Sequence, residues 1–419
     1  MLIAPGKEIF HYHFQEHHQK KRQSAATIAL KKLVKHLICE SASTERHNVL
    51  RSSSFHHLCE CALGPVHTPP NNKNKNSDIS PHYNIEHTNK LIRSYLEALK
   101  ALGSLEGMPD EIISHILEPF LHRLEEGLRT HASGPGLDPA LISGAELACR
   151  RMNLNIHHYP SLSSLHTSLS LPFSLHPHLL SQHISISQLQ LEVPFHTDSL
   201  TTVRGDTVKE RRGTCWMAEE GVGGLAYSGK IMSPIPLSES VRRVRDVLEE
   251  ELGVRYDCCL VNWYNDGDSA CKFHSDPDMG RVWSRNTVVV SVGETRRFCL
   301  RPSQPIARPG IASSAGCGDG SSQHMFHVYH GDCFHMFDDC QEAFQHCVMP
   351  GESQQNNRPR ASIVFKQSLP GAGGRRGHGI KLKKTEILDS NTSKTVKLQH
   401  NKYRSKSKNT LPRLKNKRK

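Results

Sequence analysis

A series of short strand-like runs in the second half of the chain is the feature that most constrains its fold. Between residues 258 and 366 these runs read CCLVNWY, CKFHSD, NTVVVSVG, RRFCLR, FHVYHGDCFHMF and RASIVFK. They are rich in Val, Phe and Tyr and are separated by turns that contain Gly or Pro, as antiparallel strands usually are. Many short strands of this kind indicate a β-sandwich or jelly roll. We therefore expect an α+β fold in which helices flank a β core.

One of the flanking helices is predicted over residues 240–252. Val241, Val244 and Leu248 recur at helical spacing and share one face, and Gly253 follows as a residue suited to ending a helix. This helix is expected to cover one side of the strands.

The rest of the 419-residue chain differs in composition from this folded part. The start is rich in His and polar residues, which is typical of disorder, and residues 160–192 are a Ser/Leu/His run without clean periodicity. Two helical patterns lie between them, and Pro119 is expected to kink the second. The predicted regions are a disordered His-rich region over 1–84, a helical segment over 85–130, a low-complexity linker over 131–205, a folded domain over 206–370 and a disordered basic tail over 371–419.

The positive charge of the chain is concentrated at its C-terminal end. The whole chain carries a formal charge of +12, and residues 375–419 contain 16 Lys and Arg against two acidic residues. Such a tail can bind nucleic acid, or it can act as a nuclear address only. Both interpretations predict a nuclear protein, with the cytoplasm as the alternative.

We expect no membrane association, because no run of 18 apolar residues exists. The 13 scattered cysteines suggest reduced intracellular thiols.

A candidate metal site lies in the run Phe273-His274-Ser275-Asp276. Residues i and i+2 of a strand point to the same face, so His274 and Asp276 can reach one ion together. His346 follows another predicted strand and can supply a third ligand. Two histidines and one carboxylate suit a non-haem Fe(II) centre with open coordination positions. The alternative is a surface His beside a solvated Asp, since the chain has 29 histidines.

Two further strands carry polar residues on one face. Arg360, Ser362 and Lys366 alternate with apolar residues in the run RASIVFK, and Asn262 and Tyr264 share a face in NWY. A buried guanidinium suits a dicarboxylate, because it can pair with a carboxylate through two hydrogen bonds. The alternative for each residue is a polar strand position that faces water.

Taken in order, these motifs resemble the AlkB family of 2-oxoglutarate dioxygenases over residues 210–368. Asn262-Trp263-Tyr264, His274-Ser275-Asp276, His346 after Gly331-Asp332, and the strand from Arg360 to Lys366 follow the family's order. The run SVGETRRF over 291–298 and the run AYSG over 226–229 are also similar to family motifs.

The resemblance implies a double-stranded β-helix (jelly-roll) core. It also implies a dioxygenase that uses Fe(II), 2-oxoglutarate and O₂. It implies that His274, Asp276 and His346 bind the metal. It further implies that Arg360 holds the distal carboxylate of 2-oxoglutarate, assisted by Asn262 and Tyr264. Ser362 and Lys366 are also expected to contact the cosubstrate, although many family members have Asn and Arg at these positions. Lys keeps the charge of Arg but loses its planar fork.

The resemblance also suggests a substrate and residues that would contact it. Members that act on nucleic acids flip a methylated base into the pocket, so we expect an oxidative demethylase of N-methylated bases in DNA or RNA that works as a monomer. Trp216 would stack on the base or, alternatively, belong to the core. Tyr227 and Ser228 would contact the backbone or pack in a lid, and Asp278 would meet the base edge or remain a solvated turn acid. The alternative functions are a protein-directed hydroxylase or demethylase, and an inactive nucleic-acid-binding scaffold.

Overall fold

The computed structural model describes most of the chain between residues 23 and 370. The described ranges are 23–37, 43–63, 81–131, 138–167, 169–201, 207–227, 230–303, 323–352 and 358–370. The chain divides into two units, residues 1–377 and 378–419, and all described residues lie in the first. The predicted basic tail over 371–419 lies outside the described residues.

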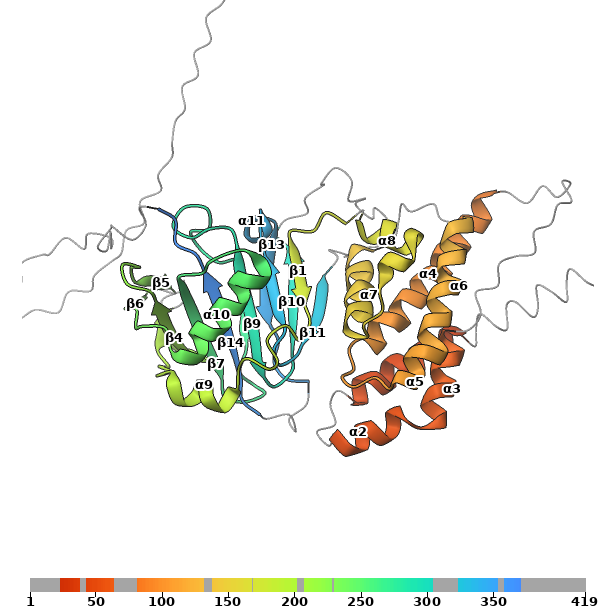
Figure 1. Ribbon diagram of the computed structural model, residues 1–419, viewed down its shortest axis with the longest axis horizontal. Helices are drawn as coiled ribbons and strands as arrows, with labels where there is room; N and C mark the ends of the chain where they lie inside the picture. The colour runs from red at the N-terminus through yellow and green to blue at the C-terminus, as the bar shows by residue number, and fades with distance from the viewer. Residues whose placement is uncertain are drawn as a thin grey trace, which may run out of the picture. The chain divides into compact units, whose positions relative to one another are not determined.

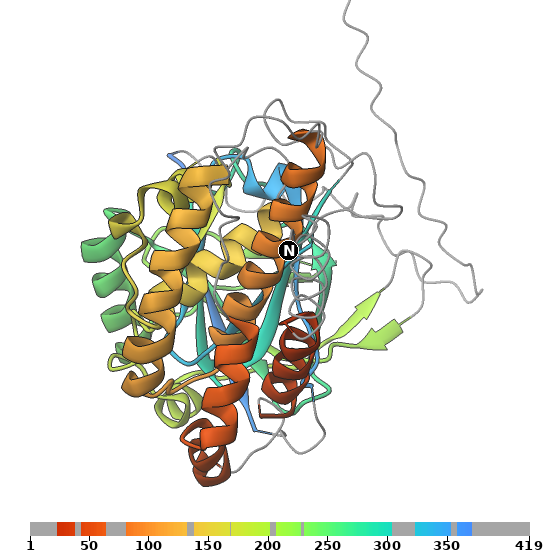
Figure 2. The same cartoon turned by 90° about the vertical axis from the view of Figure 1, so that its right-hand side faces the viewer.

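The N-terminal part of the described chain is helical and has its own apolar core. Within this part, helix α4 (Pro81–Leu102) and helix α7 (Pro139–Arg151) pack along each other (Figures 1 and 2). A first helix spans residues 23–37, and the elements that follow are α2 Ser43–Leu50, α3 Ser53–Ala62, α4 Pro81–Leu102, α5 Asp110–Ile112, the π-helix η1 Ile113–Leu117, α6 Glu118–His131, α7 Pro139–Arg151, the 3₁₀-helix η2 Ile156–His158 and α8 Pro160–Thr167.

The prediction of disorder over residues 1–84 is wrong for residues 23–37, 43–63 and 81–84, where the structure has helices. Leu30 and Val34 of the first helix and Phe55 of α3 are buried in the same core as Tyr95 of α4. Leu30 and Val34 are four residues apart and therefore lie on one face of the first helix. Burial of that apolar face offsets the polar composition of the segment. The rest of 1–84 up to residue 80 lies outside the described residues.

The linker predicted over residues 131–205 is also wrong where the structure describes it. Helix α7 begins there, because the Asp138 side chain accepts a hydrogen bond from the Ala140 amide (2.9 Å) and Pro139 occupies the first turn. Strand β1 (Phe173–His176) and helix α9 (Ile186–Glu192) follow, and β1 pairs with Cys333–Met336 of a later strand. The sheet domain therefore starts well before residue 206.

The second predicted helix is irregular just before Pro119. Its turn over Ile113–Leu117 is π-helical and lies directly before α6. Proline has no amide hydrogen to donate to the carbonyl four residues earlier, so the backbone widens locally. The structure thus has a π-helical turn directly before Pro119, while the kink expected at Pro119 itself stays a prediction.

The strands form two main antiparallel sheets. The larger has the order β1-β12-β9-β14-β7-β4, the smaller has the order β11-β10-β13-β8, and two small hairpins pair β2 with β3 and β5 with β6. The strands are β1 Phe173–His176, β2 Ser199–Thr201, β3 Thr207–Lys209, β4 Gly213–Ala218, β5 Leu225–Tyr227, β6 Lys230–Met232, β7 Cys258–Tyr264, β8 Cys271–His274, β9 Thr287–Gly293, β10 Arg296–Pro302, β11 His324–Val328, β12 Cys333–Met336, β13 Phe344–Val348 and β14 Arg360–Lys366.

Each face of the larger sheet is buried by a different neighbour. One face shares an apolar core with the smaller sheet, in which Val289 and Phe334 meet Phe298 and Phe326. The other face packs against α9 and α10 (Glu239–Leu252), as Figure 1 shows. The predicted helix over 240–252 is confirmed as α10, and Gly253 ends it with a φ of 67°. Mixed helices and antiparallel sheets match the predicted α+β class.

A short helix, α11 (Cys340–Ala343), links β12 to β13. Among the residues that the structure describes, no helix combines the length and the hydropathy needed to cross a membrane.

Helix α7 joins the helical part to the sheets through buried polar contacts. The Arg151 guanidinium donates to Asp332 Oδ2 (2.5 Å) and to the His327 carbonyl (2.7 Å). The Ser143 hydroxyl lies 3.1 Å from His324 Nδ1 on β11. These contacts tie α7 to β11 and to the turn before β12.

This interface should make the protein sensitive to acid. Burial lowers the pKa of His324 to about 4, below its ordinary value of 6.5. A depressed pKa means that the folded state excludes a proton that the unfolded chain binds, so stability present above pH 6.5 is lost as the pH falls towards 4. At pH 5 this residue should cost about 2 kcal/mol of unfolding free energy.

Urea denaturation of the wild type and of His324→Gln at pH 7 and pH 5 measures this effect. The wild type should lose about 2 kcal/mol more between the two pH values than the variant does. Equal losses in the two proteins would contradict the assignment.

Candidate metal and cosubstrate site

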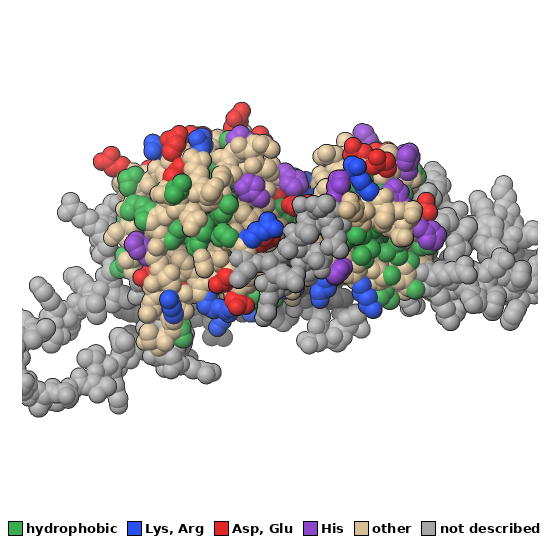
Figure 3. Space-filling view, turned by 90° about the horizontal axis from the view of Figure 1, so that it is seen from below, with side chains coloured by type: hydrophobic (Ala, Val, Ile, Leu, Met, Phe, Trp, Pro, Cys, Tyr) green, Lys and Arg blue, Asp and Glu red, His purple; other side chains and the backbone are tan. Residues whose placement is uncertain are grey.

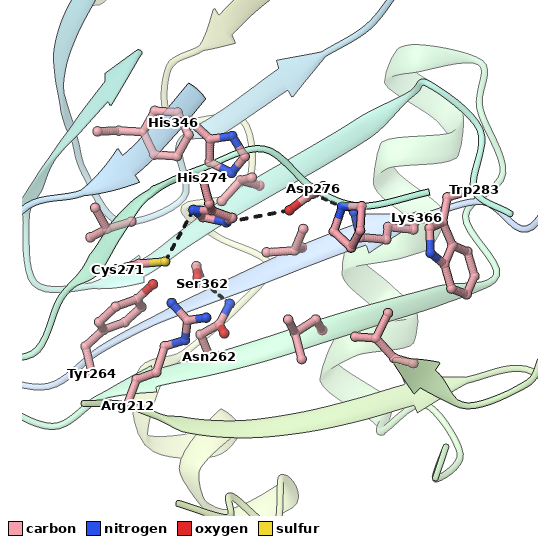
Figure 4. A pocket seen from close by; sticks show the side chains of 17 residues that line it. Arg212, Asn262, Tyr264, Cys271, His274, Asp276, Trp283, His346, Ser362 and Lys366 are labelled. Atoms are coloured by element: carbon pink, nitrogen blue, oxygen red, sulfur yellow. Dashed lines mark hydrogen bonds and ion pairs between the residues drawn. The ribbon is translucent and has the colours of Figure 1, made fainter. Parts of the chain in front are cut away.

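The three predicted metal ligands come together between two neighbouring strands of the smaller sheet. His274 ends β8, Asp276 follows two residues later, and His346 lies on β13 directly opposite His274. Their potential ligand atoms all lie within 4.8 Å of one another (Figure 4). Among the described residues, no other group of three His, Cys, Asp or Glu side chains comes together in this way. The arrangement leaves one side of the group facing the pocket.

Backbone and ring contacts fix the orientation of both histidines. His274 Nδ1 lies 2.9 Å from the Lys272 carbonyl and donates to it, so Nε2 is turned to Asp276 Oδ1 at 3.6 Å. The His346 ring is stacked on Phe298, with centroids 5.6 Å apart, and lies 4.3 Å from the His274 ring. A hydrogen bond from the far ring nitrogen is the usual way in which proteins aim a histidine at a metal.

The charges of the group also suit a cation. Burial raises the pKa of Asp276, but the neighbouring Lys366, His346 and His274 outweigh burial and hold it well below its usual range. Burial lowers the pKa of His346 to about 3. Burial alone would lower the pKa of His274 as well, but Cys271 and Asp276 raise it to about 9. At neutral pH the group therefore offers a carboxylate and a neutral His346, and a bound cation would displace the proton of His274.

Asp276 is held in place by two buried side chains. Lys366 Nζ lies 2.6 Å from Asp276 Oδ2, and the Gln341 side-chain oxygen accepts a hydrogen bond from the Asp276 amide at 2.9 Å. Lys366 was predicted to contact the cosubstrate. The contact found is with a metal ligand, and the cosubstrate contact stays a prediction.

The polar side chains predicted to bind 2-oxoglutarate lie in register across the larger sheet. Strand β7 pairs with β14, which places Tyr264 opposite Arg360 and Asn262 opposite Ser362. Asn262 Nδ2 donates to Ser362 Oγ at 3.2 Å, and both residues line the pocket together with Tyr264 and Lys366. The four strand positions thus face the same pocket as the metal ligands.

Arg360 is fully buried behind Tyr264. None of its three guanidinium nitrogens has a hydrogen-bond partner among the described residues, and the guanidinium carbon lies 4.9 Å from the centre of the Tyr264 ring. A buried guanidinium without partners is costly unless a ligand supplies them. A dicarboxylate would do so, and the donor set therefore fits 2-oxoglutarate.

The predicted substrate-contacting residues are placed differently. Trp216 is buried, donates from Nε1 to the Gly223 carbonyl at 3.1 Å and packs edge-on against Trp283, with ring centroids 5.4 Å apart. This environment supports the core alternative for Trp216. Asp278 has a φ of 61° and pairs with the exposed Arg281 at 2.5 Å, which supports the alternative of a solvated turn acid.

The structure describes less of Tyr227 and Ser228, the residues predicted to contact the substrate backbone or to pack in a lid. Tyr227 ends β5, but its side chain lies outside the described residues, as does all of Ser228. Leu225, two residues before Tyr227, is the described residue of this strand that lines the pocket.

Several pocket residues were missed by the sequence analysis. Arg212, Cys271, Trp283 and Phe298 line the pocket beside the predicted residues. For Cys271 a signal was available, because it lies three residues before His274, and its sulfur is 3.6 Å from His274 Nδ1. Arg212 and Trp283 reach the pocket only through strand pairing and packing, for which the sequence holds no local motif.

Part of the chain is similar to known proteins. A family model described as the 2OG-Fe(II) oxygenase superfamily matches residues 174–369. An uncharacterized protein of Acanthamoeba polyphaga mimivirus is 30% identical over 185 residues, which cover 44% of this chain and 87% of the viral protein. A solved structure of a Trichoplax adhaerens prolyl hydroxylase, in complex with a peptide fragment of the hypoxia inducible factor oxygen degradation domain, matches with a TM-score of 0.29. It is 12% identical, and the match covers 47% of this chain and 84% of the hydroxylase.

The match to the superfamily includes all three predicted metal ligands and the buried Arg360. It starts within β1, which confirms that the domain begins before residue 206. Residues 174–369 therefore form a domain that matches the 2OG-Fe(II) oxygenase superfamily, and the protein is a dioxygenase that uses Fe(II), 2-oxoglutarate and O₂.

Proposed function

We propose that this dioxygenase oxidatively demethylates N-methylated bases in DNA or RNA. The observation that carries the proposal is the pocket wall beside the metal ligands, where Leu225, Leu260, Trp283 and Val364 form an apolar surface with one aromatic ring. A flat, uncharged or weakly charged ring suits such a wall better than an extended polar chain does. The AlkB-like order of the motifs supports the same substrate class.

The chemistry follows from the family. When bound, Fe(II) with 2-oxoglutarate and O₂ supplies an oxidation that converts the cosubstrate to succinate and CO₂ and hydroxylates a C–H bond. A hydroxylated N-methyl group breaks its C–N bond to give formaldehyde and the bare amine. The protein's part is to hold the base so that its methyl carbon faces the open side of the His274, Asp276 and His346 group.

The nucleic-acid partner would be bound mainly by charge outside the sheets. On the face drawn in Figure 3, Lys and Arg side chains lie among acidic ones and form no single basic surface. We therefore assign phosphate binding to the basic C-terminal tail, whose 16 Lys and Arg over residues 375–419 would release counterions on binding. The tail also supports a nuclear location, and we propose a monomer with a double-stranded β-helix core.

The test is succinate production by the full chain with Fe(II), ascorbate and 2-oxoglutarate, with and without methylated DNA and RNA oligonucleotides. Formaldehyde is followed in parallel. Stimulated succinate with equal formaldehyde on one oligonucleotide is the expected result. Succinate without stimulation by any oligonucleotide, together with stimulation by protein extracts, would replace the proposal by a protein-directed hydroxylase or demethylase.

A further inference from the structure

Two buried cysteines face each other across neighbouring strands of the smaller sheet. Strand β10 pairs with β13 in antiparallel register, and this register places Cys299 directly opposite Cys347. Both residues are only 1% exposed, and a hydrogen bond joins their side chains. Opposed residues of an antiparallel pair have Cα atoms about 4.5–5.5 Å apart, and disulfides usually join Cα atoms about 4.4–6.8 Å apart. The strand pairing therefore holds the two sulfurs where a bond between them can form.

The surroundings of Cys299 make it the thiol that reacts first. The hydrogen bond with Cys347 lowers the pKa of the Cys299 thiol. Three further side chains lower this pKa in the same way, against the effect of burial, namely Arg297, Gln323 and Lys100. The thiolate is the form of cysteine that attacks an oxidant, so these neighbours favour reaction at Cys299.

The cover over the two sulfurs is made of side chains that lie at the surface. Gln323 is exposed and hydrogen-bonds Cys299. Met349 is half-buried and lies against Cys347, with 3.6 Å between the two sulfur atoms. Surface side chains change rotamer within nanoseconds, so a small neutral molecule such as hydrogen peroxide can reach the sulfurs without unfolding of the sheet.

The cysteine pair lies directly behind a candidate metal ligand. Successive residues of a strand point to opposite faces, so Cys347 points away from the pocket that its neighbour His346 lines. Phe298, the neighbour of Cys299, stacks on the His346 ring with centroids 5.6 Å apart. Opposed Cβ atoms of a sheet are about 4.5–5.5 Å apart, whereas a disulfide draws them to about 3.8 Å. Oxidation would thus shift β13 against β10 at the residue next to His346.

We propose that Cys299 and Cys347 are an oxidation site at which a peroxide forms a reversible disulfide, and that this disulfide displaces His346 and weakens metal binding. The inference does not depend on the methylated base proposed above.

The reaction takes two electrons from the two sulfurs. The Cys299 thiolate attacks one oxygen of hydrogen peroxide and the O–O bond breaks, which leaves a sulfenic acid on Cys299. The hydroxide that departs takes up the proton that Cys299 had lost and becomes water. The Cys347 thiol then attacks the sulfenic sulfur, the S–S bond forms, and the sulfenic oxygen leaves as a second water. A thiol reductant reverses the reaction by exchange.

The test treats the metal-free full chain with a small excess of hydrogen peroxide, which is removed before metal is added. Peptide mass mapping without reductant should find Cys299 linked to Cys347, with both thiol hydrogens lost. Mn(II) binding, followed by electron paramagnetic resonance, should weaken roughly 10-fold, the usual effect of disturbing the contacts around a metal ligand. Dithiothreitol should restore both the free thiols and the Mn(II) affinity.

Cys299→Ala and Cys347→Ala should each bind Mn(II) as the untreated wild type does, before and after peroxide, because neither can form the bond. Cys149→Ala is the matched control, since Cys149 is equally buried but lies in the core of the helical part. It should respond to peroxide as the wild type does. Absence of the link between Cys299 and Cys347 would overturn the proposal. A link that leaves Mn(II) affinity unchanged would overturn it too, as would equal weakening by peroxide in the Cys299 and Cys347 variants.

Discussion

Replacing His274 by alanine should abolish succinate production and weaken divalent metal binding by more than about 100-fold, because one of three ligands is lost. The fold should survive, since His274 ends an edge strand of the smaller sheet and its side chain is one-third exposed. Mn(II) binding, followed by its electron paramagnetic resonance signal, measures the metal site directly. Circular dichroism at the same protein concentration reports on the fold.

His183→Ala is the control for this experiment, because His183 is an exposed histidine in the turn region before α9. It should bind Mn(II) and produce succinate as the wild type does. If His274→Ala kept either property, the metal site would have to lie elsewhere in the chain.

The grouping of the candidate metal ligands was predictable because two of them lie close together in the sequence. His274 and Asp276 are two residues apart at the end of a strand, so alternation alone places them together. His346 is 70 residues away from Asp276, and its place after another predicted strand and the resemblance to a family pointed to it among 29 histidines. The structure brings it opposite His274 through the pairing of β13 with β8.

The residues around the predicted cosubstrate site were predictable only in part. Arg360 and Ser362 lie on one strand whose alternation is plain in the sequence, and the buried position of Arg360 confirms the expected face. Arg212 and Trp283 have no such pattern around them. They reach the pocket because β4 pairs with β7 and because Trp283 packs on Trp216, and both contacts join segments far apart in the sequence.

The fold was predicted well for the sheets and poorly for the first 200 residues. Composition led to the wrong conclusion there, since a His-rich and Ser-rich segment can still bury a regular apolar face. The spacing of Ala26, Leu30 and Val34 was a readable helix signal, as were the Asp138-Pro139 cap and first turn of α7. Strand β1 is only four residues long, and its place beside β12 depends on tertiary pairing alone.

Replacing Arg360 by methionine should have opposite effects on stability and on cosubstrate binding. Without ligand, Arg360 is a buried cation with no hydrogen-bond partner, and Met has a similar length without the charge. Removing such a group should raise the unfolding free energy of the ligand-free protein by about 1–3 kcal/mol, or the melting temperature by a few degrees. Binding of 2-oxoglutarate to the Mn(II)-loaded variant should weaken roughly 100-fold, so the cosubstrate should no longer stabilise it.

Arg296→Met separates this explanation from a general effect of removing a buried arginine. Arg296 is also buried, but it donates to the Thr295 carbonyl (3.0 Å) and to the Asp266 carbonyl (3.1 Å). Its loss removes both hydrogen bonds, so Arg296→Met should lower the melting temperature of the ligand-free protein. A site that keeps an arginine unpaired until its ligand arrives gives up stability for binding, and the two variants should therefore move in opposite directions. A lower melting temperature in Arg360→Met would instead mean that Arg360 supports the sheet, and the distal carboxylate would then have to bind elsewhere.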